Sequence, residues 1–190
     1  SDIFAQIIHA DGKAASPIWV NGAAAPCDRP SMATLPTGKL MIGWSEFDLD
    51  SKSSWDIRTA IVSNTGVVVG SPITLNDFRS YDQTGVRISS GSEGALAVWS
   101  TRGADGSGLG IAAKAITANG LVAGEEMILN QNRRNDQFAP NVVATASGYR
   151  AIWSDFSGIS TGVDLSARDL KKVSVTPRQK LRLSWEAVVG

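Results

Sequence analysis

The stretch WDIRTAIVSNTG, residues 55–66, sets the architecture of this chain because it recurs at intervals of about 54 residues. Its counterparts are SDIFAQIIHADG (1–12), LGIAAKAITANG (109–120) and, in shortened form, VDLSARDL (163–170). Tryptophans follow the same period and end the apolar runs GWS, VWS and IWS at Trp44, Trp99 and Trp153. A fixed period of this size is typical of propellers, solenoids and arrays. We therefore expect residues 1–170 to hold copies that start near residues 2, 56, 110 and 164.

Within the second copy, four short segments have the alternation or the β-branched residues that are typical of strands. They are DIRTAIVS (56–63), VVVGSPITLN (67–76), GVRISS (85–90) and ALAVWS (95–100). Apolar residues on both faces, such as Ile57 and Val62, suit a sheet packed between two neighbours. The pattern predicts an all-β, propeller-like repeat domain with one four-stranded antiparallel sheet per copy. The repeated tryptophans are expected to lie buried between neighbouring sheets.

The composition of the 190-residue chain excludes several classes of partner. Basic and acidic residues number 18 each, so the zero formal charge gives no electrostatic basis for binding nucleic acid or an acidic membrane surface. No apolar run approaches the roughly 20 residues that would insert into a membrane. Residues 1–20 lack the pattern of a secretory signal, so an exported protein would carry its signal outside this chain. One cysteine, Cys27, and one histidine, His9, exclude an internal disulfide and chemistry that needs several imidazoles.

The first copy also carries motifs that are similar to those of a known family. D-I-x-A-Q, A-D-G, V-N, R-P-S-M-A and P-T-G-K-L-M-I-G-W resemble bacterial tandem repeats built around D-I-Y-A-Q-R and D-G-x-x-x-V-x-W. The resemblance covers about residues 1–170. Members of that family are large extracellular or cell-surface proteins that look like propellers and share no catalytic residue set. The resemblance implies a secreted or cell-surface bacterial protein with a non-catalytic binding or structural role, such as adhesion.

Residues 171–190 allow two interpretations. KKVSVTPRQKLRLSWEAVVG resembles the opening of a bacterial fibronectin type III domain that is truncated here, with Trp185 at the core position. Alternatively, PRQKLRLSW (177–185) aligns with PTGKLMIGW (36–44) without a gap. In that case the C-terminus supplies the strand pair that residues 2–21 lack, and the ring closes with four blades. A ring that stays open would expose sheet edges, which favours an oligomer or a longer chain.

One loop combines acidic residues in a pattern that resembles a metal site. DLDSKSSWD (48–56) places Asp48, Asp50 and Asp56 at positions one, three and nine, as in calcium loops of some propeller blades. Lys52 puts a positive charge at position five, where a ligand would be needed, so a solvated turn is favoured. Calcium is the one cofactor that the residues suggest.

The same loop is similar to the Asp-box of sialidase-type propellers, S-x-D-x-G-x-T-W, through Asp50 and Trp55. Arg29, before Pro30, resembles the arginine that holds a carboxylate in those enzymes. Only two tyrosines, Tyr81 and Tyr149, are present for the nucleophile that the enzymes need. The resemblance implies, as the alternative function, a sialidase-like glycoside hydrolase or a carbohydrate-binding lectin.

Repeat proteins keep their strands constant and vary their loops, so we expect ligand contacts from loops 22–28, 45–55, 77–84, 101–109 and 131–139. Asp28, Asp82 and Asp136 recur about 54 residues apart and are expected to cap loops by accepting backbone N–H groups. No catalytic residue is predicted. The side chains expected to contact a glycan or protein ligand are Trp19, Trp55, Phe78, Tyr81, Arg133 and Phe138.

Overall fold

The computed structural model describes residues 2–22, 25–49, 54–156 and 162–171, and the regular structure among them consists of strands. A short hairpin, β1 (Phe4–Ala5) and β2 (Ile18–Trp19), comes first. A four-stranded sheet follows, with β3 (Cys27–Thr34), β4 (Leu40–Phe47), β5 (Trp55–Val62) and β6 (Val68–Thr74). The next four-stranded sheet contains β7 (Gln83–Gly91), β8 (Gly94–Arg102), β9 (Leu109–Thr117) and β10 (Val122–Ile128). The last sheet contains β11 (Gln137–Thr145), β12 (Gly148–Asp155) and β13 (Asp164–Lys171).

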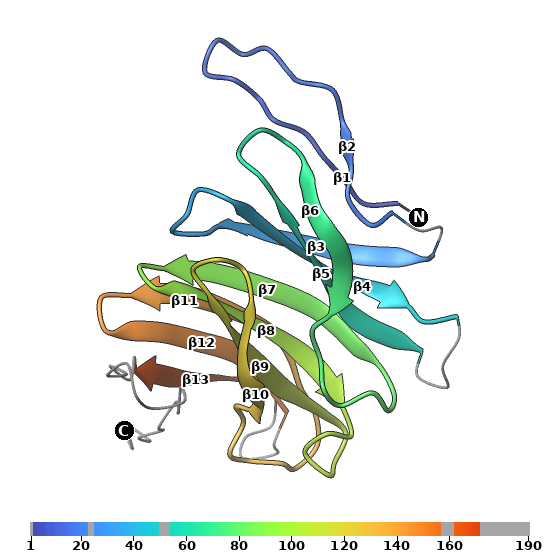
Figure 1. The fold of residues 1–190 in the computed structure, drawn as a ribbon. Coiled ribbons are helices and arrows are strands. Elements are labelled where there is room, and N and C mark those ends of the chain that lie inside the picture. Colours follow the sequence, from blue (N-terminus) through green and yellow to red (C-terminus); the bar gives the residue numbers. More distant parts are fainter. Residues whose placement is uncertain (1, 23–24, 50–53, 157–161, 172–190) are drawn as a thin grey trace.

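The sheets are antiparallel meanders that stack side by side, as the blades of a propeller do (Figure 1). In each sheet the strands lie in chain order, and the first strands β3, β7 and β11 pack next to one another along the inner side of the array. The all-β, blade-like architecture that the period predicted is therefore confirmed. No helix that could cross a membrane occurs among the described residues.

The boundaries of the sheets differ from those that the repeat predicted. Residues 56–101 were expected to form one sheet, but β5 and β6 join β3 and β4, whereas β7 and β8 join β9 and β10. The hairpin between β4 and β5 stays within one sheet, and the connection between β6 and β7 crosses to the next. A period gives the length of the repeating unit but not its starting point, so the prediction had the wrong phase. β7 also begins at Gln83, two residues earlier than predicted.

Each gap between sheets is filled by an apolar cluster that contains one repeated tryptophan. Trp44 lies between the β1–β2 hairpin and the first four-stranded sheet, Trp99 between the two four-stranded sheets, and Trp153 between the second of these and β11–β13. Their exposed fractions are 0%, 0% and 4%. The prediction that they are core residues between sheets is confirmed. Both faces of the central sheet are covered, as its apolar residues on both faces require.

A repeated asparagine ties the last strand of a sheet to the strand before it. The Oδ1 atoms of Asn21, Asn76 and Asn130 accept the backbone N–H groups of Ile3, Ile57 and Ile111 at 2.9, 2.8 and 2.8 Å. These asparagines are at most 4% exposed. Their side chains satisfy buried amide groups where the fourth strand ends, which explains why asparagine recurs at this position.

A buried lysine connects the two four-stranded sheets. The Nζ atom of Lys114, in β9, donates to the backbone carbonyl of Leu75 at 3.0 Å and forms an ion pair with Asp77. Asp77 also accepts the backbone N–H of Glu126, and the Glu126 carboxylate accepts the N–H groups of Asp77 and Phe78. Partial burial by itself raises the pKa of Asp77, but the hydrogen bonds from Lys114 and from the Glu126 backbone outweigh it and hold the pKa below the ordinary 3.8.

We expect Lys114→Met to lower the free energy of unfolding by about 1–3 kcal/mol at pH 7, because the Leu75 carbonyl loses its buried donor. Urea denaturation measures this change. The exposed ion pair of Lys13 with Asp11 provides the control, and Lys13→Met is expected to change stability by less than about 0.5 kcal/mol. Since a lowered carboxyl pKa stabilises the fold above pH 3.8, the Asp77 part of the loss should fade as the pH drops below that value. Equal losses in the two variants would contradict this account.

The two ends of the array present apolar faces. Phe4 and Trp19 lie opposite each other in the N-terminal hairpin and are 61% and 49% exposed. At the other end Leu165 is 81% exposed, although Ile57 and Ile111, at the same position of earlier copies, are fully buried. No described sheet covers either face (Figure 1). Residues 177–185 and Trp185 lie outside the described residues, so ring closure and the fibronectin-like segment both stay predictions.

Candidate functional site

The three inner strands share an irregularity near their starts. The register of each with its neighbour shifts between Asp28 and Ser31 in β3, between Thr84 and Arg87 in β7, and between Phe138 and Asn141 in β11. The residues at these bulges with positive φ angles are Arg29, Gly85 and Ala139, at 52°, 72° and 51°. A bulge re-aims the side chains beside it, so three bulges at one level change what the inner strands present there.

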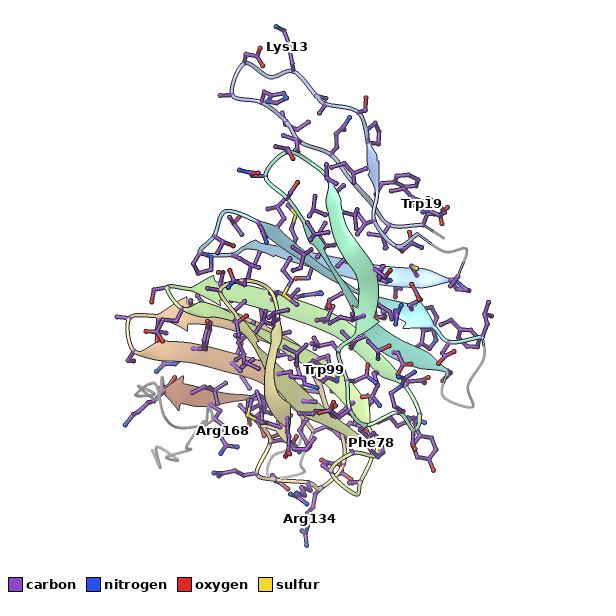
Figure 2. The ribbon with its side chains drawn as sticks, viewed as in Figure 1. Lys13, Trp19, Phe78, Trp99, Arg134 and Arg168 are labelled. Atoms are coloured by element: carbon purple, nitrogen blue, oxygen red, sulfur yellow. The ribbon has the colours of Figure 1, made fainter. Side chains whose placement is uncertain are left out.

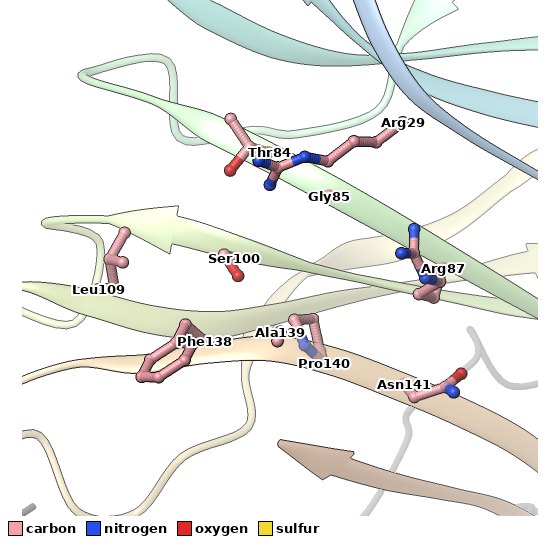
Figure 3. A pocket seen from close by; sticks show the side chains of 10 residues that line it. All are labelled: Arg29, Thr84, Gly85, Arg87, Ser100, Leu109, Phe138, Ala139, Pro140 and Asn141. Carbon is pink, nitrogen blue, oxygen red and sulfur yellow. The ribbon is translucent and has the colours of Figure 1, made fainter. Parts of the chain in front are cut away.

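A cavity of about 430 Å³ lies where the bulges converge (Figure 3). Two arginines, Arg29 from β3 and Arg87 from β7, provide its charge, and Phe138 from β11 is the largest apolar side chain in its lining. The other lining residues are Thr84, Gly85, Ser100, Leu109, Ala139, Pro140 and Asn141. The volume is within the range of pockets that bind small ligands. The described lining contains hydroxyl, amide and guanidinium groups but no carboxyl, imidazole, thiol or phenol group.

The two arginines reach the cavity in different ways. Nε of Arg29 contacts the carboxylate of Asp28 at 3.0 Å, and both side chains are more than half exposed. The end of the Arg29 guanidinium extends over Gly85, where a Cβ atom would lie 3.7 Å from Nη1. Nη1 of Arg87 donates to the carbonyl of Val86 at 2.9 Å. Each guanidinium therefore keeps further N–H groups beyond these contacts.

The connections predicted to form the binding surface gather at one end of the sheets. Asp48, in the β4–β5 connection, pairs with Arg79 of the β6–β7 connection at 3.1 Å. In the next repeat, Asn130 of the β10–β11 connection donates to Asp105 of the β8–β9 connection at 2.7 Å. Neighbouring connections also meet, since Gly103 of the β8–β9 connection lies against the ring of Tyr81 in the β6–β7 connection. The cavity lies beside this end, because its lining includes Arg29, Thr84 and Phe138, which lie near the starts of the inner strands.

The structure distributes the six predicted ligand contacts over several places. Phe138 alone lines the cavity, and Trp19 lies on the uncovered N-terminal hairpin, well away from Phe78 (Figure 2). Trp55 is half-buried, and its ring packs edge-to-face against Phe47 at 5.7 Å. Tyr81 is 62% exposed. Arg133 is exposed and approaches the carbonyl of Asp105 at 3.4 Å.

Phe78 lines a second, acidic cavity of about 740 Å³ on the outer side of the central sheets. Asp77, Glu125 and Glu126 also line this cavity. Burial of Glu126 raises the pKa of its carboxyl, although the N–H groups of Phe78 and Asp77 oppose the shift. Asp77 and Glu126 already bond across the gap between the sheets, as described above, so this cavity is part of the contact between sheets.

Two of the three predicted calcium ligands have protein partners. The Arg79 guanidinium lies 3.1 Å from Asp48 and 2.8 Å from Asp56, so one cation already pairs with both carboxylates. Asp56 is buried and also accepts a hydrogen bond from Asn76 Nδ2 at 2.7 Å. Asp50 lies outside the described residues. Across the described part of the chain, no three acidic, histidine or cysteine side chains are grouped as a metal site.

The predicted column of Asp28, Asp82 and Asp136 is only partly correct. Asp28 lies within β3 and pairs with Arg29, whereas Asp82 and Asp136 precede β7 and β11. Asp136 accepts the backbone N–H of Leu109 at 2.9 Å, as a capping role requires. Asp82 instead accepts the hydroxyl of Ser54. The connection before β3 has a different length from the connections before β7 and β11, so an interval of 54 residues did not align equivalent positions.

Cys27 occupies the position that Gln83 and Gln137 occupy in the other inner strands. Its Sγ atom lies 3.6 Å from Glu46 Oε2 and 3.3 Å from the carbonyl of Ala25. Burial, followed by the nearby Glu46 carboxylate, raises the pKa of the thiol from 9.0 to about 11. The thiolate is therefore scarce at neutral pH, which supports the reading of Cys27 as a structural residue.

We expect iodoacetamide to alkylate Cys27 about a hundredfold more slowly at pH 8 than a cysteine of pKa 9.0, because the two pKa values differ by about two units. Mass spectrometry of the native protein over time measures the rate, and the unfolded chain in urea provides the reference. Glu46→Gln removes one cause of the shift and should raise the rate. Native and unfolded rates that agree would contradict the raised pKa.

Comparisons with known proteins show the fold but no family. No family model matches the chain, and no curated protein matches it. A crystal structure of a protein of unknown function from Dyadobacter fermentans is similar over 82% of this chain, with a TM-score of 0.58 and 14% identity. This chain spans 41% of the length of that protein. An α-L-arabinofuranosidase from Lactobacillus brevis gives a TM-score of 0.48 and 13% identity. The similarity covers 88% of this chain and 53% of the arabinofuranosidase.

Proposed function

We propose that this chain is a non-catalytic binding module of a secreted or cell-surface bacterial protein. Its ligand, a glycan or a protein segment, binds at the end of the sheets where the connections gather, next to the cavity of Arg29, Arg87 and Phe138. The composition of the cavity is the observation that carries the proposal. The cavity provides hydrogen-bond donors and an aromatic ring, which are groups that bind ligands. Its described lining contains no pair of carboxyl groups.

Glycoside hydrolysis, the alternative, uses two carboxyl groups in most enzymes and a tyrosine nucleophile with a carboxylate partner in sialidase-type enzymes. In either case a carboxyl group must line the site. The described lining of the cavity has none, and the buried Asp56 is already paired with Arg79. The similarity to the arabinofuranosidase adds no support for hydrolysis, because both the TM-score and the identity are low. A lectin-like role, in contrast, is one form of the proposed binding function.

A glycan array probed with the labelled chain, with and without calcium, tests the proposal. The expected result is saturable binding of a subset of glycans that chelation of calcium does not weaken, since Arg79 already pairs with two of the suggested ligands. The same protein is incubated with fluorogenic sialosides and other aryl glycosides. Turnover that Arg29→Ala abolishes would overturn the non-catalytic assignment, and a blank array would remove the support for a glycan ligand.

A further inference from the structure

The cavity between the inner strands combines features that select for charge as well as shape. Two guanidinium groups line it, and no described lining residue carries a negative charge. Asp28 neutralises part of Arg29 through Nε, but the Nη1 end extends over Gly85 toward the cavity (Figure 3). The local charge is therefore positive in a protein whose formal net charge is zero.

The backbone of the inner strands creates room for a ligand beside these groups. Gly85, at the bulge of β7, has no side chain, so the Arg29 guanidinium lies directly over the backbone. The φ angle of 72° also favours glycine at this position. Pro140 and Phe138 of β11 form the opposite wall, where the aromatic ring offers a flat apolar surface.

We infer that the cavity binds an anionic group, a carboxylate or a sulfate, on a saccharide ligand. Arg29 and Arg87 hold the anion, because guanidinium groups form charge-assisted, paired hydrogen bonds with two oxygens of a carboxylate or of a tetrahedral oxyanion. Phe138 packs against the sugar ring that carries the anion, as aromatic rings pack on the apolar faces of ligands. This inference rests on the proposed binding function and narrows its ligand to acidic saccharides.

Calorimetric titration with trigalacturonate and with its methyl ester tests the inference, because the ester keeps the same sugar rings but its carboxyl groups carry no charge. The acid is expected to bind at least tenfold more tightly than the ester at low salt. A disaccharide titrated in its sulfated and its unsulfated form shows whether the cavity prefers a sulfate to a carboxylate. Free sodium sulfate shows whether the anion alone is sufficient.

Arg29→Gln and Arg87→Gln are each expected to weaken binding of the preferred acid by about tenfold and to weaken binding of the neutral ester much less. Arg134→Gln removes the same charge from an exposed residue at the same end of the molecule, outside the cavity lining, and should change affinity by less than twofold (Figure 2). The thermal midpoint of each variant confirms that it is folded.

The possible outcomes separate this inference from the proposed function. Equal affinity for the acid and ester forms, or binding of neutral glycans alone, would overturn the anion site and leave the binding module intact. An effect of Arg134→Gln as large as that of Arg29→Gln would also overturn it, because attraction would then be diffuse. No binding of any saccharide, acidic or neutral, would overturn this inference together with the glycan ligand of the proposed function.

Discussion

Replacing Trp99 with alanine is expected to lower the free energy of unfolding by about 3–5 kcal/mol. The indole is fully buried at the centre of the cluster between the two four-stranded sheets, so its removal leaves a cavity between blades that packing cannot easily fill. Figure 2 shows it in the interior of the array. Chemical denaturation followed by far-ultraviolet circular dichroism measures the loss. A change below about 1 kcal/mol would mean that the two sheets do not depend on this contact.

Phenylalanine substitutions of two repeated tryptophans separate the role of the ring from that of its N–H group. Trp44 donates its indole N–H to Glu46 Oε2 at 2.9 Å, whereas the N–H of Trp99 has no acceptor among the described residues. Trp44→Phe removes a bond to a charged group and should cost more than Trp99→Phe, by about 1–2 kcal/mol. A larger loss of stability for Trp99→Phe than for Trp44→Phe would contradict the absence of an acceptor for the Trp99 N–H among the described residues.

Replacing Gly94 with alanine is expected to be the second most destabilising change, at about 2–5 kcal/mol. A Cβ atom at Gly94 would lie 2.0 Å from the backbone oxygen of Ile116, and the φ angle there is 154°. The hairpin between β7 and β8 must shift away from β9 to make room, which disturbs the pairing of the central strands. Gly148 has the same φ and the same 2.0 Å approach to Leu170, so its substitution should have a similar effect.

Gly106→Ala is the matched control for Gly94→Ala. Gly106 also has a positive φ, 87°, but no atom lies within 4 Å of the position of its Cβ. Its substitution introduces backbone strain without a clash and should cost only about 1 kcal/mol. Thermal unfolding of both variants under identical conditions compares the two. Similar losses would mean that the close approach to Ile116 is relieved without cost.

Part of the candidate site could be predicted and part could not. Phe138 was predicted from its loop, and Arg29 was noticed because it precedes Pro30, a proline at the start of a strand. Arg87 was missed because it lies in the middle of an apparently regular strand, GVRISS. The register shift beside it has no proline in β7, since Val86 takes the place that proline occupies in the other two inner strands, and Gly85 is the signal that remains there. The equivalent Pro30 and Pro140 were the available hint of an irregularity.

The structure also explains positions that the repeat pattern left without a role. Gly110 occupies the place of Asp56, and the carboxylate of Asp105, from a neighbouring connection, fills the space and bonds to Asn130 instead. Arg168 occupies the place of Lys114 and donates to the carbonyl of Leu129 at 2.7 Å, just as Lys114 donates to Leu75. Different residues thus make the same contact in successive copies, and a comparison based on residue identity does not detect this equivalence.

The amino-acid pattern alone determined the strands, the repeating unit and the burial of the tryptophans, because alternation and period are properties of neighbouring residues along the chain. Tertiary packing decided which strands share a sheet, where the bulges bring Arg29 and Arg87 together, and which apolar faces stay uncovered. Those features arise from contacts between strands and between sheets, such as the hydrogen bond from the Ile88 N–H to Ser31 Oγ, and a periodic sequence offers several equivalent ways to make them. Only the three-dimensional arrangement selects one.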